Sequence, residues 1–183
     1  VTSTAPQEGK TTTLVNIAKL LASSGEKAIV IDCDLRRAQL HTWLGLDREP
    51  GLTDHFVSHV DLDTLIRKTR VPNLFALTAG VLPPNPPALL ARRDLDKLLT
   101  RLRAHFEWIL IDSPPLASVT DALLLARHAD AVVENHAPGQ LAAWGLGFDA
   151  LSAANPALVL VSITPFGQTG PYSKFQGNSL AAM

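Results

Sequence analysis

The amino-acid sequence predicts an α/β fold in which a mostly parallel β-sheet is covered by helices on both of its faces. Two observations predict this fold: short runs of apolar residues recur along the chain, and segments with helical spacing of leucine lie between them. A strand that is apolar at every position is buried on both faces, as in a parallel sheet between two helical layers. Helices that alternate with such strands indicate βαβ units.

The elements can be assigned in order along the chain. The first is a helix that presents Leu14, Ala18 and Leu21 on one face and ends at Ser23-Ser24-Gly25. The remaining expected elements are a buried strand at 28–31, a rigid proline-rich surface loop at 80–90, a helix around 95–102, a buried strand at 108–111, a helix at 121–127, a strand at 131–133, helical turns at 141–155 broken near Gly145 and Gly147, and a buried strand at 158–163.

The composition is that of a globular protein and excludes several function classes. The chain has 183 residues, of which 46% are hydrophobic, and a formal net charge of −1. This length suits one full domain, or one domain plus a fragment. Its balanced charge gives no support for nucleic-acid binding. The single Cys33 excludes an internal disulfide, and no apolar run approaches the roughly 20 residues that cross a bilayer. We expect a cytoplasmic location.

The segment STAPQEGKTTT places Gly9, Lys10 and Thr11 directly before the first predicted helix, with Thr12 following. In this order, backbone N–H groups at a helix N-terminus cradle phosphate oxygens, the lysine neutralises phosphate charge, and the threonine hydroxyl can bind Mg²⁺. The pattern G-x-x-x-x-G-K-[ST] is incomplete, because Thr4 stands at the position of its first glycine. Taken alone, the segment would equally fit a helix cap after a flexible turn.

Three aspartates follow two of the predicted buried strands. Asp32 and Asp34 come at the end of the strand at 28–31, and Asp112 follows the strand at 108–111. Ligands of open parallel sheets bind outside the carboxyl ends of the strands, so these carboxylates should gather with the Gly-Lys-Thr segment around one Mg²⁺–phosphate site. The alternative, three surface-turn aspartates that never meet, is disfavoured by this agreement.

The three segments STAPQEGKTT, IVIDCDLRR and ILIDSPP together resemble the bacterial tyrosine kinases of capsule and exopolysaccharide synthesis, which have a MinD-like P-loop fold. The resemblance covers residues 1 to about 133. Ala5 favours the kinase branch, since the related MinD and ParA ATPases carry a signature lysine there. Gln7 departs from the glycine of many family loops. The resemblance implies a tyrosine kinase that transfers a phosphoryl group from ATP, with Mg²⁺ as cofactor.

The resemblance also implies roles for individual residues and partners. The implied site comprises nucleotide contacts from Gly9, Lys10, Thr11, Thr12 and Arg36, Mg²⁺ ligands from Thr11, Asp32, Asp34 and Asp112, and catalytic roles for Lys10, Asp32 and Asp34. The implied partners are protein tyrosines and a transmembrane polysaccharide co-polymerase that activates the kinase at the inner face of the plasma membrane. A homo-oligomer is also compatible with the resemblance.

The last third of the chain resembles another family. The segments VVENHAPG, NPALVLVSI and FGQTGPY are similar to those of the family III CoA-transferases, over residues 130–183. That family's catalytic aspartate would lie downstream of Met183. We therefore expect two units, residues 1–133 and 134–183, that meet in a chimera, either a natural fusion or an artefact of sequence assembly. CoA becomes the alternative ligand, and a non-catalytic remnant becomes a third alternative.

Two features of this arrangement bear on the expected activity. The phosphate loop normally leaves a buried strand, and only the last residues of such a strand precede it here. The single tyrosine, Tyr172, lies in the CoA-transferase-like part, where an ordinary loop tyrosine is the favoured interpretation. The sequence therefore predicts a truncated N-terminus, weak nucleotide binding and impaired kinase turnover.

Overall fold

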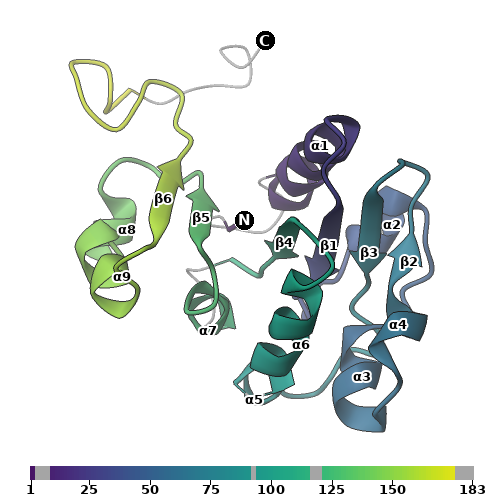
Figure 1. The fold of residues 1–183 in the computed structure, drawn as a ribbon. Helices are drawn as coiled ribbons and strands as arrows, with labels where there is room; N and C mark the ends of the chain where they lie inside the picture. Colours follow the sequence, from purple (N-terminus) through teal and green to yellow (C-terminus); the bar gives the residue numbers. More distant parts are fainter. Residues whose placement is uncertain (3–8, 92–93, 116–120, 176–183) are drawn as a thin grey trace.

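The computed structural model describes residues 1–2, 9–91, 94–115 and 121–175 and shows two β-sheets with surrounding helices (Figure 1). The strands are β1 (Ala28–Asp32), β2 (Arg67–Lys68), β3 (Leu74–Leu77), β4 (Trp108–Asp112), β5 (Ala131–Glu134) and β6 (Val159–Ser162). The helices are α1 (Lys10–Ser23), α2 (Leu40–Leu44), α3 (Leu52–Ser58), α4 (Leu62–Leu65), α5 (Pro86–Leu90), α6 (Asp94–Arg103), α7 (Asp121–Ala126), α8 (Gln140–Ala143) and α9 (Phe148–Ala154).

The larger sheet has the strand order β2-β3-β1-β4, and the smaller sheet pairs β5 with β6. β1 is parallel to both β3 and β4, and β5 is parallel to β6. Among the strands of the described residues, only β2 runs antiparallel, at the edge of the larger sheet. This arrangement confirms the predicted mostly parallel sheet. The predicted strands at 28–31, 108–111, 131–133 and 158–163 match β1, β4, β5 and β6 to within a residue or so.

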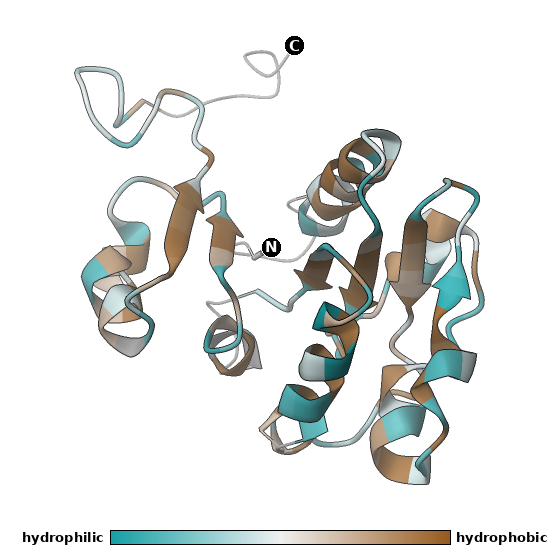
Figure 2. Ribbon diagram, viewed as in Figure 1, coloured by the Kyte–Doolittle hydropathy of each residue, from teal (hydrophilic) through white to brown (hydrophobic). Residues whose placement is uncertain are grey.

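β1 lies at the centre of the larger sheet and is buried along its whole length. Because successive side chains point to opposite faces, Ile29 and Ile31 enter one apolar core, and Ala28 and Val30 enter another. The first core is closed mainly by α3 to α6, and the second by α1 and α2. Figure 2 shows the central strands as hydrophobic ribbon between helices of mixed character. Helices therefore cover both faces, as predicted.

The two longest helices begin and end where their sequences indicate. α1 follows Gly9 and ends at Ser23, before a glycine with positive φ at position 25. α6 buries the leucines that repeat at helical spacing. Its acidic residues lie in the first turn and its arginines in the last, which complements the helix dipole. Arg103 donates to the backbone oxygen of His128 at 3.0 Å, so α6 also holds the segment that leads into β5.

Other elements differ from the sequence-based expectation. The proline-rich segment was expected to be a loop throughout, and this is wrong for residues 86–90, which form α5. Asn85 caps α5 by accepting a 3.4 Å hydrogen bond from the N–H of Ala88. Proline is tolerated in the first turn of a helix because the N–H that it lacks would have no partner there. Within the described residues, no helix is long and apolar enough to span a membrane.

Candidate nucleotide and metal site

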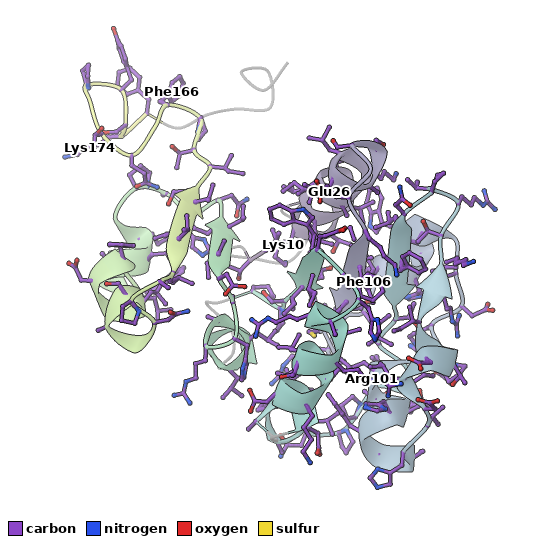
Figure 3. The ribbon with its side chains drawn as sticks, in the orientation of Figure 1. Lys10, Glu26, Arg101, Phe106, Phe166 and Lys174 are labelled. Carbon is purple, nitrogen blue, oxygen red and sulfur yellow. The ribbon has the colours of Figure 1, made fainter. Side chains whose placement is uncertain are left out.

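The predicted phosphate-binding segment lies at the amino end of α1. Gly9 precedes this helix with φ 82°, a left-handed conformation that glycine adopts without steric cost. Lys10, labelled in Figure 3, is the first residue of α1 and is buried, with 9% of its surface exposed. The backbone N–H groups of a first helical turn are available to an anion. Thr4, Ala5 and Gln7, which the sequence analysis singled out, lie outside the described residues.

Thr11 connects α1 to the end of β4. Its hydroxyl Oγ1 donates a 2.6 Å hydrogen bond to Oδ2 of Asp112, a residue that is 2% exposed. Asp112 lies directly opposite Asp32 in the parallel register of β4 and β1. The sequence analysis expects the Gly-Lys-Thr segment and three strand-end aspartates to gather at one edge of the sheet. The structure brings Thr11 together with Asp112, beside Asp32.

Among the described residues, each of the two buried carboxylates has one oxygen atom without a hydrogen-bond partner. Asp32 is fully buried, and its Oδ2 accepts a 3.1 Å hydrogen bond from the N–H of Leu40. Within the described residues, Oδ1 of Asp32 and Oδ1 of Asp112 accept no hydrogen bond. A buried polar atom without a partner costs free energy, and a hard cation takes carboxylate and hydroxyl oxygens as ligands. Thr11, Asp32 and Asp112 therefore fit a Mg²⁺ ion.

The electrostatics of the pair favour protonation when no cation is present. Burial, reinforced by the negative charge of Asp112, raises the pKa of Asp32 to about 8. Burial also raises the pKa of Asp112, and the hydrogen bond from Thr11 opposes that increase. Low dielectric surroundings penalise an ionised carboxylate, and a nearby carboxylate adds repulsion. A cation between the two groups would remove both penalties, so cation binding and protonation compete at this position.

Asp34 is placed differently from the other two aspartates. Its Oδ1 accepts hydrogen bonds from the backbone N–H groups of Arg37 at 3.0 Å and Arg36 at 3.3 Å, in the turn after β1. In the part of the chain that the structure describes, no three His, Cys, Asp or Glu side chains gather as a ligand group for a metal ion. Mg²⁺ usually takes one or two carboxylates and completes its shell with phosphate oxygens and water.

The remaining predicted residues are more exposed than Asp32 and Asp112. Thr12 is half-buried in the first turn of α1, and Arg36 has an exposed side chain. One contributor was missed by sequence reasoning: the backbone N–H of Leu40 fixes the carboxylate of Asp32. Side-chain patterns carry no signal for such a backbone donor, because any residue type could supply it.

Known proteins resemble this chain in sequence and in structure. The tyrosine-protein kinase ptk of Acinetobacter johnsonii is 35% identical over 143 residues, which is 77% of this chain and 20% of that protein. The solved kinase domain of VpsO is 30% identical, has a TM-score of 0.72, and is matched over 88% of this chain and 82% of the domain. The chain belongs to the bacterial tyrosine kinase family. It spans about a fifth of the ptk length and between 56% and 63% of shorter curated kinases of the family.

The fold extends beyond the tyrosine kinase family. The septum site-determining protein MinD of Pyrococcus horikoshii OT3, solved in complex with Mg-ADP, has a TM-score of 0.71 at 22% identity, over 92% of this chain and 70% of that one. This likeness confirms the MinD-like P-loop fold. Residues 116–182 match the family description CoA-transferase family III. The resemblance of the last third of the chain to that family is therefore confirmed alongside the kinase membership of the rest.

The CoA-transferase-like segment folds around its own motif residues. Glu134, 2% exposed, accepts a 2.5 Å hydrogen bond from the backbone N–H of His136. The ring of His136, itself buried, packs edge-on against Trp144 at 5.2 Å between ring centroids. These contacts anchor the loop between β5 and α8. Both contacts join residues of this segment to one another.

Proposed function

We propose that this protein binds Mg²⁺·ATP at the amino end of α1 and transfers a phosphoryl group to protein tyrosine. The observation that carries the proposal is the buried hydrogen bond from Thr11 to Asp112, beside an Asp32 carboxylate that is only partly satisfied. Family membership supports the same reaction, since the relatives are described as tyrosine-protein kinases. Phosphoryl transfer depends mostly on positioning and charge neutralisation, which such a site supplies.

Each residue has a defined task in this proposal. The ammonium of Lys10 and the first N–H groups of α1, together with Gly9 and Thr12, hold the phosphates. Thr11, Asp112 and Asp32 hold Mg²⁺, which supplies neutralisation of the phosphate charge. Asp34 completes the metal shell through water. Either Asp32 or Asp34 also orients the tyrosine hydroxyl and accepts its proton. Arg36 extends from the same turn toward solvent and contacts the bound nucleotide.

The first experiment is a thermal-shift titration with Mg²⁺·ATP, run in parallel with CoA and with the Lys10→Ala variant. A ligand present at about 100 times its Kd stabilises the folded state by roughly 2.7 kcal/mol. We expect ATP to stabilise the wild-type chain and not the Lys10→Ala variant. Stabilisation by CoA alone would support the CoA-transferase alternative, and stabilisation by neither ligand would support a non-catalytic remnant.

We propose two substrates or partners for the kinase reaction: a tyrosine-bearing protein and a transmembrane co-polymerase that brings the kinase to the inner face of the membrane. The test of the first is transfer of labelled phosphate from ATP to a glutamate-tyrosine copolymer, with Asp112→Asn as the inactive control. Incorporation equal to that of the control would contradict the proposal. The second is tested by co-sedimentation with membranes that do or do not contain the co-polymerase.

We also propose that the two sequence families meet within β5, with residues 1–133 and 134–183 as the two units. The kinase relatives align over about 133 to 143 residues of the chain, whereas the CoA-transferase match begins at residue 116, so the two matches overlap around β5. A parallel strand of either origin can lie on such a sheet. An intact long-read clone across codons 125–140 tests for a natural fusion, and a split in that interval would identify an assembly artefact.

A further inference from the structure

Three polar side chains lie in a row where the central strands of the larger sheet end. The strand order places β3, β1 and β4 side by side, with β1 in the middle (Figure 1). Thr78 directly follows the last residue of β3, and Asp32 and Asp112 are the last residues of β1 and β4. All three are buried, with at most 2% of their surface exposed. The row therefore extends the candidate metal site by one strand.

Alternation along β3 sets the direction of the Thr78 side chain. Ala76 belongs to the apolar core on the side of α1 and α2, whereas Leu77 and Ala79 belong to the core on the opposite face. Side chains of an extended chain alternate between the two faces of a sheet. The place of Ala79 in the second core shows that this alternation continues past the end of β3. Thr78 therefore points toward the face that α1 and α2 cover.

The carboxylates of Asp32 and Asp112 point to the same face. Oδ2 of Asp32 accepts a 3.1 Å hydrogen bond from the N–H of Leu40, the first residue of α2. Oδ2 of Asp112 accepts a 2.6 Å hydrogen bond from the hydroxyl of Thr11 in α1. Because α1 and α2 cover one face of the sheet, Thr78, Asp32 and Asp112 are neighbours on that face of three adjacent strands.

The strand register brings Thr78 close to Asp32. β1 and β3 are parallel and pair Ile31 with Leu77, so Asp32 and Thr78 each follow a paired residue. Neighbouring strands lie about 4.8 Å apart, and rotation about χ1 brings a hydroxyl and a carboxylate at such positions within hydrogen-bonding reach. Asp112 lies on the other side of Asp32, two strands away from Thr78. Thr78 can therefore act on this site through Asp32.

Each member of the row has an oxygen atom with an unused capacity for hydrogen bonding. Within the part of the chain that the structure describes, Oγ1 of Thr78, Oδ1 of Asp32 and Oδ1 of Asp112 have no hydrogen-bond partner. A buried hydroxyl without a partner costs free energy, which an apolar side chain of the same shape would not. A carboxylate that binds a metal is usually oriented by hydrogen bonds from neighbouring donors. Thr78 offers such a donor next to Asp32.

We propose that Thr78 is a positioning residue of the metal site, and that its hydroxyl donates a hydrogen bond to Asp32 when that carboxylate holds a divalent cation. A carboxylate oxygen has two lone pairs, so Oδ1 can accept from Thr78 on the side of β3 and bind the cation on the side of β4. With Oδ2 held by the N–H of Leu40, the carboxylate could then no longer rotate away from the cation. This inference rests on the metal site of the proposed function, and not on phosphoryl transfer.

The test compares Thr78→Val with Thr53→Val, since valine has the shape of threonine without the hydroxyl. Thr53 is 3% exposed, its Oγ1 also has no hydrogen-bond partner among the described residues, and it belongs to α3 on the opposite face of the sheet. Without metal, both variants should melt at or above the temperature of the wild type, because each loses a buried hydroxyl that has no partner. Only Thr78→Val should weaken the binding of Mn²⁺, by about tenfold or more.

Electron paramagnetic resonance of free Mn²⁺ measures this affinity in the absence of nucleotide. Asp112→Asn identifies the part of the binding that belongs to this site. Thr78→Ser keeps the hydroxyl and should keep an affinity close to that of the wild type. Unchanged affinity in Thr78→Val would overturn the proposal, as would equal losses in the serine variant or in Thr53→Val. A metal-free Thr78→Val chain that melts well below the wild type would also overturn it, because the hydroxyl would then have a structural partner.

The nucleotide is tested separately, with Mg²⁺·ATP and Lys10→Ala. A wild-type chain that binds Mn²⁺ in a manner dependent on Thr78, but is not stabilised by Mg²⁺·ATP, would refute the proposed nucleotide binding and leave this inference standing. A chain that responds to Mg²⁺·ATP equally with threonine or valine at position 78, and binds Mn²⁺ equally, would refute this inference alone. A wild type that binds no Mn²⁺ at this site would refute both the metal role of Asp32 and this inference.

Discussion

The hydroxyl of Thr11 and the carboxylate of Asp112 are joined by a 2.6 Å hydrogen bond although 101 positions separate them in the sequence. This bond fixes the amino end of α1 against the carboxyl end of β4. Both atoms are oxygens, which is the ligand type that Mg²⁺ prefers. The bond joins two elements that are far apart in the sequence, and under the proposed function its two partners would also bind the metal.

Substitution of Thr11 tests the contribution of its hydroxyl group to stability and to Mg²⁺ binding. We expect Thr11→Ala to lower the free energy of unfolding by about 1–3 kcal/mol without ligand, because Asp112 loses a buried hydrogen bond. The Mg²⁺-dependent part of ATP stabilisation should also disappear. Thr11→Ser keeps the hydroxyl and is the matched control. Urea unfolding and a thermal-shift titration check the two effects, and an alanine variant that still responds to Mg²⁺·ATP would exclude Thr11 as a ligand.

The raised pKa of Asp32 predicts a pH dependence of stability in metal-free protein. The pKa is about 8 in the folded state and near the ordinary value of 3.8 when unfolded, so the folded state binds more protons between these values. The free energy of unfolding attributable to this group therefore falls as pH rises from about 4 to about 8. Asp32→Asn should flatten that decline, as measured by urea unfolding in a chelator between pH 5 and 9.

The exposed Asp47 provides the control for this pH effect. Asp47→Asn removes a carboxylate of the same type from a solvated position and should leave the decline unchanged. If the wild-type chain and Asp32→Asn lose stability in parallel over this pH range, the carboxylate of Asp32 is not the group responsible. Addition of Mg²⁺ above pH 8 should stabilise the wild-type chain more than the Asp32→Asn variant.

The sequence predicted the parts of the fold that carry a strong periodic or apolar signal. α1, α6 and the strand at 28–31 follow directly from leucine spacing and continuous burial. The meeting of Thr11, Asp32 and Asp112 followed from the rule that strands of a parallel sheet end at the same edge. These features are local or topological, so one sequence suffices to predict them.

The parts that the sequence did not predict depend on tertiary contacts. β2 has two residues and α4 has four, lengths too short for any periodic pattern. β3 has the sequence LFAL, which would equally suit a buried helical turn, and only its pairing with β1 decides the matter. The engagement of Asp34 by backbone N–H groups of its own turn was hidden for the same reason, since side-chain spacing does not reveal local turn geometry.

α1 offers a direct test of the packing that holds the site in place. Leu14 is fully buried beneath this helix, whereas Leu20 on the same helix is 69% exposed. We expect Leu14→Ala to lower the free energy of unfolding by about 2–5 kcal/mol, because the apolar burial is lost and a cavity remains. Leu20→Ala should stay within roughly 0.5 kcal/mol of the wild type. Equal losses in urea unfolding would contradict the placement of the helix.

The approach of two loops at Gly51 gives a last and more severe prediction. A Cβ atom at this position would lie 2.2 Å from the backbone oxygen of Thr78 and 2.4 Å from the backbone nitrogen of Gly80. The Thr78 oxygen accepts a 2.8 Å hydrogen bond from the N–H of Leu52, and the N–H of Gly80 donates a 3.1 Å hydrogen bond to the oxygen of Arg48. Neither backbone atom can therefore move away without breaking a hydrogen bond. Gly51→Ala should therefore separate α3 from the end of β3 and strongly destabilise the fold.

The matched control is Gly45, which has φ 65° and open space around the position of its missing Cβ. Gly45→Ala introduces only the backbone strain of a left-handed alanine, about 1–2 kcal/mol. We expect thermal melting to rank the wild type above Gly45→Ala, and Gly45→Ala well above Gly51→Ala. Because both substitutions add the same methyl group, a reversal of this order would show that the contact between the two loops is looser than the 2.2 Å approach requires.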